Sequence, residues 1–519
     1  MNHPAVTRIT DQGRIRSYLS DESAVFHGRA DELFLPEREA EVAEVLRHAN
    51  ETGKRLALSA GGTSITGSRV PAGGGAVLSV ERMVGVESEP PPGFEVVESA
   101  GFTLHLDREN RLAIAPPAIP LSTLDPILAR HGLCYPPDPT EMSAYLSGTV
   151  ATNASGARSF HYGPTRDWIR RLRVVLPTGE VAEVRRGDPP AEADELTIEA
   201  DGRTVRVPLP GPDEYRMPAT KNAAGLYLRR GMEPIDLFIG SEGLLGVITE
   251  IEIDLVERPE HTLTVVAYFP DRDRALDFVD AGVEDGRPFD YLSLEYFGGR
   301  ALEFMRDARP DIPTPVAAAI LFELAYVPES GSPYPPNKLI EGLRSELARH
   351  GAASDWAVPS GRREDVRLFR HALPEGVNEF VRRHTGKIGS DMAVPHGRFR
   401  EMMAAYERES EAAGVRFLIF GHIGDDHVHL NYLPENEQQA ARAMKAYGRL
   451  ARLAVEMGGT VSAEHGVGKK TVPAGGRDEP YLLLQYGEPG LRAIARVKQA
   501  LDPNRVLNVG NMVPEEMLG

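Results

Sequence analysis

Three loops of small residues in the first half of the chain constrain its fold more than any other feature. The first runs from Ser59 to Ser68, the second spans residues 135–158 and the third spans residues 239–249. Glycine lets a backbone approach an anion closely, and backbone amides and hydroxyls can donate to phosphate oxygens. The first loop matches neither the G-x-G-x-x-G motif nor the P-loop motif, so alone it fits an ordinary loop or a phosphate cradle. One extended ligand touched at several points explains all three loops better than three independent turns do.

The pattern of apolar residues predicts a mixed α+β unit up to about residue 258. Helices are predicted over Glu37–Asn50 and Ser122–Arg130, and Asp201-Gly202 marks a hairpin turn. The segment from Phe238 to Leu255 is expected to begin and end as strands. After Pro259 strands and helices alternate with short connections. The predicted organisation is a first domain over 1–258 with an N-terminal extension of about 25 residues, a second domain over 259–470, and a C-terminal segment over 471–519.

Composition excludes several classes of protein. The chain has 58 Lys+Arg and 76 Asp+Glu, and this net charge of −18 argues against a nucleic-acid partner. The single cysteine, Cys134, cannot form an internal disulfide or ligate an iron–sulfur cluster by itself. The N-terminal residues lack a signal-peptide pattern, and no apolar run approaches the ~20 residues of a spanning helix. A cytoplasmic location is therefore expected, with peripheral contact at the inner face of the membrane left open.

A cluster of histidines and carboxylates lies between Phe420 and Asn431. His422 and His429 are seven residues apart, which would place them on opposite faces of a straight strand. A turn at Gly424–Asp426 would let both point into one space, and His427 shares a face with His429. Imidazoles and a carboxylate suit Zn²⁺ or Mn²⁺. Downstream, Glu464-His465 lies in a glycine-flanked loop that can supply a ligand and a base. The alternative is a pair of polar loops with exposed histidines.

The ordered set of three loops resembles the FAD-binding domain of the vanillyl-alcohol oxidase/p-cresol methylhydroxylase flavoproteins. Closest are the D-lactate and D-2-hydroxyglutarate dehydrogenases and the glycolate oxidase flavoprotein subunit, and the resemblance runs from about residue 30 to the C-terminus. It implies an α+β fold with a two-subdomain FAD-binding domain, an α/β substrate (cap) domain with an antiparallel sheet, and a C-terminal segment that returns to the flavin. The FAD is expected to be non-covalent, because the first loop has no histidine and Cys134 is a poor candidate.

The resemblance also implies the cofactor-binding residues. They come from the three loops and the C-terminal segment, and they are Gly61, Gly62, Thr63, Ser64, Gly67, Ser68, Pro137, Asp138, Gly148, Thr149, Asn153, Gly156, Glu242, Gly243, Gly246, Ile248 and Asn508.

By the same resemblance, His422, His429 and Glu464 would bind a divalent metal, with Zn or Mn as candidates, and His465 would act as the base. One departure stands out, since the family often has Gly-Asn where this chain has Asp426-His427. His427 could replace the asparagine as a polar contact, or it could compete as a ligand. The sequence leaves these alternatives open.

The activity that the resemblance implies is oxidation of a small D-2-hydroxy acid of the lactate, glycolate or 2-hydroxyglutarate class, with hydride transfer to flavin N5. Arg370 and Lys387 are expected to bind the substrate carboxylate, with Asn431 as a further polar contact. Electrons would pass to a separate acceptor, which could be an iron–sulfur or cytochrome partner, a quinone, an electron-transfer flavoprotein or oxygen. A homodimer is left open. Three rival functions remain: an alkylglycerone-phosphate-synthase-like flavoenzyme, a flavin-free metallohydrolase, and a non-catalytic flavin-binding subunit of a larger oxidoreductase complex.

Overall fold

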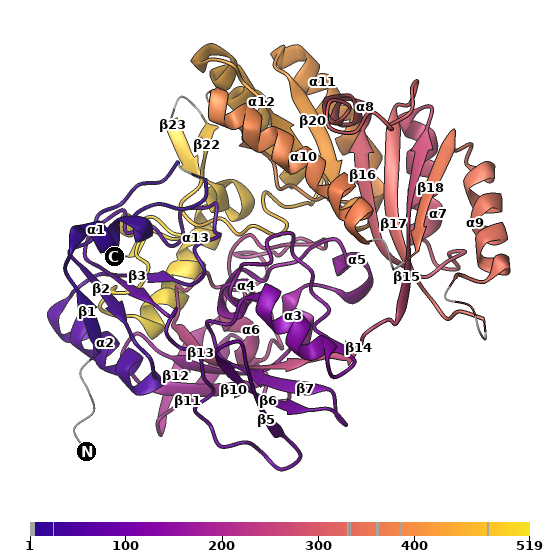
Figure 1. Cartoon of the computed structure of the whole chain (residues 1–519). Coiled ribbons are helices and arrows are strands. Elements are labelled where there is room, and N and C mark those ends of the chain that lie inside the picture. Colours follow the sequence, from indigo (N-terminus) through magenta and orange to yellow (C-terminus); the bar gives the residue numbers. More distant parts are fainter. Residues whose placement is uncertain are drawn as a thin grey trace.

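Three sheets form the framework of the molecule (Figure 1). The computed structural model describes residues 6–23, 25–329, 332, 334–359, 363–384, 386–474 and 477–518. The first two sheets come from residues before 255 and the third begins at His261. Helices and mainly antiparallel strands mix throughout, which confirms the predicted α+β class.

The first sheet has four strands in the order β1-β2-β4-β3. β1 runs antiparallel to β2, whereas β2, β4 and β3 are parallel. Helix α2 packs on this sheet through Val42, Val45 and Leu46, and it ends at Gly53, whose φ of +68° is a left-handed conformation suited to glycine. The first small-residue loop leaves the end of β3. The bounds are β1 (Thr7–Ile9), β2 (Glu32–Leu35), β3 (Leu56–Ser59), β4 (Ala76–Ser79), α1 (Gln12–Ile15), η1 (Arg16–Tyr18) and α2 (Glu39–Thr52).

The second sheet has eight antiparallel strands in the order β12-β11-β10-β9-β13-β7-β6-β5. β11 and β12 form the hairpin expected at Asp201-Gly202. The strands are β5 (Glu95–Ser99), β6 (Phe102–Asp107), β7 (Leu112–Ala115), β9 (Ile169–Val175), β10 (Val181–Arg185), β11 (Glu195–Ala200), β12 (Arg203–Pro208) and β13 (Val247–Asp254). The helical segments beside them are α3 (Leu121–Ala129), α4 (Leu146–Thr152), α5 (Ser159–Tyr162), η2 (Thr165–Trp168) and α6 (Pro234–Phe238).

One expected strand in this half is wrong. Phe238 ends helix α6, and the chain becomes a strand only at Val247. The helix starts with a proline in its first turn and a reciprocal hydrogen-bonded cap between Glu233 and Asp236. These local features outweigh the strand-like run of apolar residues that follows them.

The third sheet has seven antiparallel strands in the order β18-β15-β17-β16-β20-β21-β19. Its first four strands and helices α7 and α9 form a split β-α-β pattern of the ferredoxin type. Helices α7, α9, α11 and α12 contribute to the core on one face, and α8 and α10 to the core on the other. The strands are β15 (His261–Phe269), β16 (Tyr291–Gly298), β17 (Ala318–Tyr326), β18 (Ser354–Pro359), β19 (Ile388–Gly389), β20 (Phe417–Gly421) and β21 (His429–Tyr432). The helices are α7 (Arg272–Val283), α8 (Gly299–Met305), α9 (Asn337–Arg349), α10 (Arg363–Arg383), η3 (His396–Arg398), α11 (Phe399–Ala413), η4 (Ile423–Asp425) and α12 (Glu437–Glu456).

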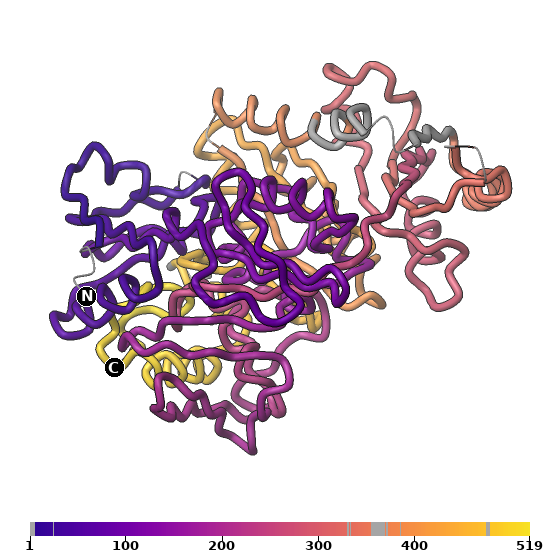
Figure 2. Tube along the Cα trace, turned by 60° about the horizontal axis from the view of Figure 1, so that its bottom comes forward, coloured from indigo at the N-terminus to yellow at the C-terminus, as the bar shows by residue number. Residues whose placement is uncertain are grey.

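The C-terminal segment returns to the first sheet. Helix α13 (Tyr481–Leu501) follows the hairpin of β22 (Thr471–Ala474) and β23 (Arg477–Pro480), and η5 (Glu515–Leu518) ends the described chain. Leu56 of β3 donates its N–H to Val506, and Asn508 donates back to Leu56. Figures 1 and 2 show this yellow segment lying against the indigo N-terminal part. A last small pair, β8 (Leu133–Cys134) and β14 (Val256–Glu257), precedes the third sheet. Among the described helices, none combines the length and the apolar character that crossing a membrane requires.

Candidate active site

The histidine cluster lies on a tight turn between β20 and β21. His422 follows β20, η4 reverses the chain, and His429 begins β21 opposite Phe420. Asp426 completes the turn with φ +53°, a left-handed conformation that aspartate tolerates better than most residues. The rings of His422 and His429 have their centroids 5.5 Å apart. The turn therefore brings together two side chains that a straight strand would separate.

The carboxylate of Glu464 lies at the centre of the cluster. Its Oε1 atom is 3.4 Å from His422 Nε2 and 3.3 Å from His429 Nε2. Two ligands of one tetrahedral ion, each bonded at ~2.1 Å, lie about 3.4 Å apart. Each histidine nitrogen is thus spaced from the Glu464 oxygen as two ligands of a single cation are, and the residues fit a divalent metal.

Partners on the outer side fix the orientation of both histidines. His422 Nδ1 is 2.6 Å from Glu295 Oε1, and His429 Nδ1 is 3.1 Å from the carbonyl oxygen of Ser390. Metal-binding histidines commonly direct their second ring nitrogen to such an oxygen, which sets the tautomer. Burial alone would lower the pKa of His422, but Glu295 and Glu464 raise it to about 10, so the local field attracts a cation.

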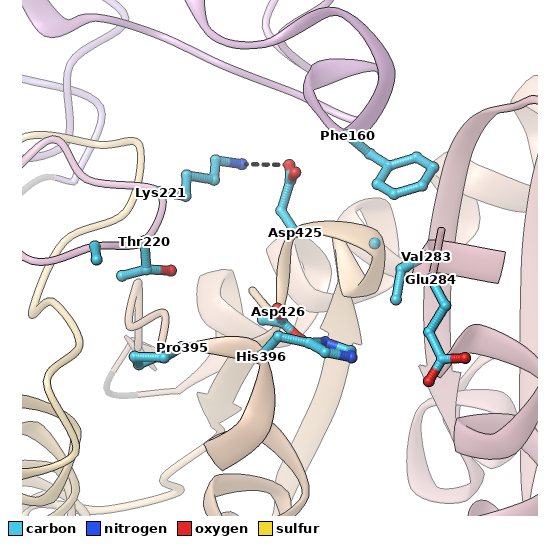
Figure 3. Close-up of a pocket in the computed structure, with 11 residues that line it drawn as sticks. Phe160, Thr220, Lys221, Val283, Glu284, Pro395, His396, Asp425 and Asp426 are labelled. Carbon is cyan, nitrogen blue, oxygen red and sulfur yellow. Dashed lines mark hydrogen bonds and ion pairs between the residues drawn. The ribbon is translucent and has the colours of Figure 1, made fainter. Parts of the chain in front are cut away.

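The second oxygen of Glu464 is held by the first half of the chain. Lys221 Nζ lies 3.0 Å from Glu464 Oε2 and Ser155 Oγ donates to the same atom at 3.2 Å. Lys221 also reaches Asp425 Oδ2 at 3.4 Å, as Figure 3 shows. Burial would raise the pKa of Glu464, yet Lys221 and His422 hold it well below its usual range. The side chain of Glu464 is therefore ionised and held in one position.

His465 lies at the open side of this centre. Its ring stacks on that of His429 with a centroid distance of 5.4 Å, and its Nε2 atom is 3.6 Å from Glu464 Oε1. Asp391 Oδ1 lies 3.4 Å from Nδ1, and Asp391 Oδ2 accepts the backbone N–H of His465 at 2.9 Å. Burial lowers the pKa of His465 to about 4 although Asp391 and Glu464 oppose it. The imidazole is therefore neutral near pH 7 and can accept a proton.

Glu242, expected to line the cofactor, holds the loop that carries His465. Its buried carboxylate accepts the N–H groups of Val467 at 2.7 Å and Gly468 at 2.9 Å. Burial raises the pKa of Glu242, and these two amides oppose that effect. Asn508 and Asn511 donate to its carbonyl oxygen. The third small-residue loop is thus joined to both the loop that carries His465 and the C-terminal segment.

The three small-residue loops contact one another. The N–H groups of Gly240 and Glu242 donate to carbonyl oxygens in α4. A side chain at Gly61 would crowd Tyr145, and one at Gly156 would lie 1.9 Å from the carbonyl oxygen of Asp138. Glycine is therefore required where these backbones approach each other.

The other predicted cofactor residues differ in what they contact. Ser64 and Ser68 share hydrogen bonds within the first loop, where Gly67 has a left-handed φ of +74° and Gly62, also left-handed, lies beside Arg69. Asn153 and Thr149 bond locally, to the N–H of Arg166 and to the carbonyl of Leu146. Those that pack against other elements are Gly148 beside Ala60, Gly243 beside Leu58 and Asn508, and Gly246 beside Val174. Ile248 is buried in the core of the second sheet, and Thr63 and Pro137 lie in the first and second loops.

The predicted substrate anchors are placed unequally. Asn431 is buried on β21, two residues from His429 and therefore on the same face of the strand. Lys387 is exposed, and surrounding protein atoms and Lys470 lower its pKa. Arg370 belongs to α10, but its side chain lies outside the described residues.

A cavity of about 470 Å³ adjoins the centre (Figure 3). Lys221 and Asp425 line it on the side of Glu464, and Phe160 lines it from the first half. At its rim His396 Nδ1 lies 2.9 Å from Asp426 Oδ1. The cavity therefore opens beside the loop that carries the histidines.

Sequence reasoning gave no role to Asp391, Glu295 or Lys221. A signal existed for Glu295, because it is the one charged residue in the apolar strand Tyr291–Gly298. Lys221 lies in a loop without any local pattern and could not have been found.

Models of known protein families match segments in both halves of the chain. The model described as "FAD binding domain" matches residues 30–185, and that described as "FAD linked oxidases, C-terminal domain" matches residues 258–512. The chain belongs to the FAD-linked oxidases. This FAD-linked oxidase carries the histidine cluster and Glu464 in its C-terminal domain and the small-residue loops mainly in its FAD-binding part.

Relatives match this FAD-linked oxidase over nearly its whole length. Glycolate oxidase subunit GlcD of Bacillus subtilis is 26% identical, covering 96% of this chain and 92% of the relative. D-lactate dehydrogenase of Archaeoglobus fulgidus is 26% identical over 93% and 92%, and D-2-hydroxyglutarate dehydrogenase of Xanthomonas citri is 25% identical over 98% and 94%. A solved alkyldihydroxyacetonephosphate synthase has the same fold, with a TM-score of 0.64 at 15% identity over 96% of this chain and 82% of that one.

Proposed function

We propose that this FAD-linked oxidase converts a small D-2-hydroxy acid into the 2-oxo acid. The observation that carries the proposal is the position of His465, whose Nε2 atom lies 3.6 Å from the carboxylate of Glu464 in the histidine-lined centre. The names of the relatives, glycolate oxidase, D-lactate dehydrogenase and D-2-hydroxyglutarate dehydrogenase, support the same substrate class.

Two groups would supply the chemistry that side chains lack. FAD, held without a covalent bond by the three small-residue loops, would supply the acceptor for the hydride from C2 of the substrate. A divalent cation, Zn²⁺ or Mn²⁺, on His422, His429 and Glu464 would supply a Lewis acid for the substrate hydroxyl.

The protein binds, orients and moves the proton. Lys387 and Arg370 bind the substrate carboxylate as cations, and Asn431 adds a polar contact. Asp391, 3.4 Å from His465 Nδ1, favours a proton on that atom and leaves the Nε2 lone pair free. His465 Nε2 then accepts the hydroxyl proton, and general base catalysis of this type gives about 10²–10⁴-fold in rate. Loss of the proton and the hydride leaves the 2-oxo acid.

Anaerobic reduction of the flavin tests the proposal. The absorbance near 450 nm is recorded while D- and L-lactate, glycolate, malate and D-2-hydroxyglutarate are added separately, with dithionite as the control for a competent flavin. We expect one D-2-hydroxy acid, or achiral glycolate, to bleach the band, and the L-enantiomer to leave it. A flavin that dithionite bleaches and no hydroxy acid does would refute the proposal. A colourless purified protein would instead favour a metallohydrolase.

A synthase without net oxidation shares this scaffold. The likeness to alkyldihydroxyacetonephosphate synthase lies at 14–15% identity and therefore speaks for the fold alone. In the same anaerobic experiment, such an enzyme would keep its 450 nm band with every hydroxy acid. Oxidised product and a lasting bleach together separate the two chemistries. We propose further that the electrons leave to a separate acceptor, because the one cysteine cannot ligate a cluster.

A further inference from the structure

His427 is a fully buried histidine whose Nδ1 atom has no hydrogen-bond partner among the described residues. Its exposed fraction is 0%, and its other ring nitrogen, Nε2, lies 3.0 Å from Asp391 Oδ1. Buried polar atoms in native proteins almost always have a partner, so the unpartnered Nδ1 calls for an explanation. The ring is not isolated, because its centroid is 4.6 Å from that of His429 and 5.6 Å from that of His422.

The ring of His427 repeats the arrangement of the two predicted histidine ligands. His422 and His429 each direct Nδ1 to an outer oxygen and Nε2 to Glu464. In His427 the two ring nitrogens have exchanged places. Nε2 points outward and lies 3.0 Å from Asp391 Oδ1, whereas Nδ1 points inward and lies 3.9 Å from the second oxygen of Glu464, Oε2. An inward nitrogen with an outward carboxylate is the arrangement of a metal-binding histidine.

The backbone holds His427 in this position. It pairs with Ala393 in an isolated bridge, and its N–H donates to the carbonyl oxygen of His422. Asp391 is also fixed, since its Oδ2 atom accepts from Ser462 Oγ and from the N–H of His465. The carboxylate that would orient His427 is therefore itself held in place. One possible ligand atom from each of Asp391, His427, His429 and Glu464 lies within 4.8 Å of the other three.

We propose that His427 Nδ1 is a third imidazole ligand of the cation in this centre. The inference deepens the metal site of the proposed function and rests on that site alone. The donor set then comprises three imidazole nitrogens and the carboxylate of Glu464. Such a set favours Zn²⁺, Co²⁺ or Ni²⁺ over Mn²⁺ or Mg²⁺, because imidazole suits the later divalent ions and Mn²⁺ and Mg²⁺ prefer oxygen.

Zn²⁺ affinity gives the first test. The flavin-bound protein is stripped with a chelator, and the dissociation constant for Zn²⁺ is measured by competition with a chromophoric chelator for wild type, His427→Asn and His396→Asn. Loss of an outer partner of a metal ligand costs about 10–100-fold in affinity. We therefore expect His427→Asn to weaken Zn²⁺ by more than about 100-fold and Mn²⁺ by much less. His396 pairs with Asp426 at the rim of the cavity, so His396→Asn should leave both affinities unchanged. A loss below 100-fold in His427→Asn overturns the inference.

The number of bound imidazoles gives the second test, which does not depend on the folding of the His427 variant. Cu²⁺ is bound to His465→Ala protein, in which the neighbouring ring is removed, and pulsed electron paramagnetic resonance counts the coordinated imidazoles. Three imidazoles are expected, and two would overturn the inference. Neither test uses a hydroxy acid. A protein with three bound imidazoles and no bleaching by any hydroxy acid would refute the proposed function and leave this inference standing.

Discussion

Replacing Glu242 with glutamine should release the loop that carries Glu464 and His465. The carboxylate is 4% exposed and accepts two short hydrogen bonds, from Val467 N–H at 2.7 Å and Gly468 N–H at 2.9 Å. A glutamine side chain has one acceptor oxygen and would turn an NH₂ group toward one of the two amides. At least one of these bonds is then lost while its N–H stays buried.

The size of the effect follows from the charge on the acceptor. A hydrogen bond to a charged group contributes roughly 1.5–3 kcal/mol. When the variant loop opens, it breaks one hydrogen bond fewer than the wild-type loop, so opening costs less by the free energy of that bond. A difference of 1.4 kcal/mol changes the opening equilibrium constant by about a factor of ten. We therefore expect the amides of Val467 and Gly468 to exchange hydrogen about 10- to 150-fold faster in Glu242→Gln than in wild type.

Hydrogen exchange followed by mass spectrometry on the peptide spanning 464–468 measures this directly. The control is Glu257→Gln, because that side chain is 83% exposed. Exchange rates within twofold of wild type would show that the carboxylate does not hold the loop. The readout needs neither substrate nor metal, so it stays independent of the proposed activity.

Four further outcomes are expected. His465→Ala should lower turnover by about 10²–10⁴-fold and keep the flavin bound, and near-normal turnover would remove His465 from the mechanism. Chelator treatment should abolish activity that added Zn²⁺ or Mn²⁺ restores, whereas full activity in protein shown to be metal-free would exclude a Lewis acid. Lys498→Met should lower the melting temperature clearly, since it leaves the fully buried Asp502 unpaired at a cost of about 3–5 kcal/mol, while the exposed Lys445→Met should not. Burial lowers the pKa of Lys469 in the folded protein to about 8, against 10.5 for the ordinary side chain. Between these values the unfolded chain binds more protons, so the contribution of Lys469 to stability is full above pH 10.5 and is lost as pH falls through 8. The melting temperature of wild type minus that of Lys469→Met should thus rise from pH 8 to pH 10, and a constant difference would contradict this reasoning.

Elements with strong periodicity and clear ends could be predicted from the sequence. Helix α2 has an apolar face and is followed by Gly53 with φ +68°, and the Asp201-Gly202 hairpin has its turn where the sequence places it. The short helix α6 could not be found by periodicity, because its five residues span little more than one turn. Its proline and capping pair were the only usable signals.

In the candidate site, residues that are close in sequence could be predicted to meet, whereas residues that are far apart in sequence could not. His422 and His429 are close in sequence, so a turn between them was enough to bring them together. Their partner Glu295 and the cation Lys221 come from segments more than 100 residues away, and their positions depend on the pairing of β16 with β20 and on how the two halves meet. A single sequence carries no periodic signal for such contacts. Glu242 shows the limit best, since it lies in a predicted cofactor loop but its carboxylate binds the loop of His465.

Contacts from the first half clamp the loop 464–468 at both ends. Ser155 and Lys221 hold Glu464 at one end, and Glu242 holds Val467 and Gly468 at the other. The His465 ring lies between these clamps and faces the histidines of the third sheet. Separating the two halves would therefore leave the carboxylates of Glu464 and Glu242 without their buried partners, which is costly. These contacts consequently join the flavin-binding half and the histidine centre into one unit.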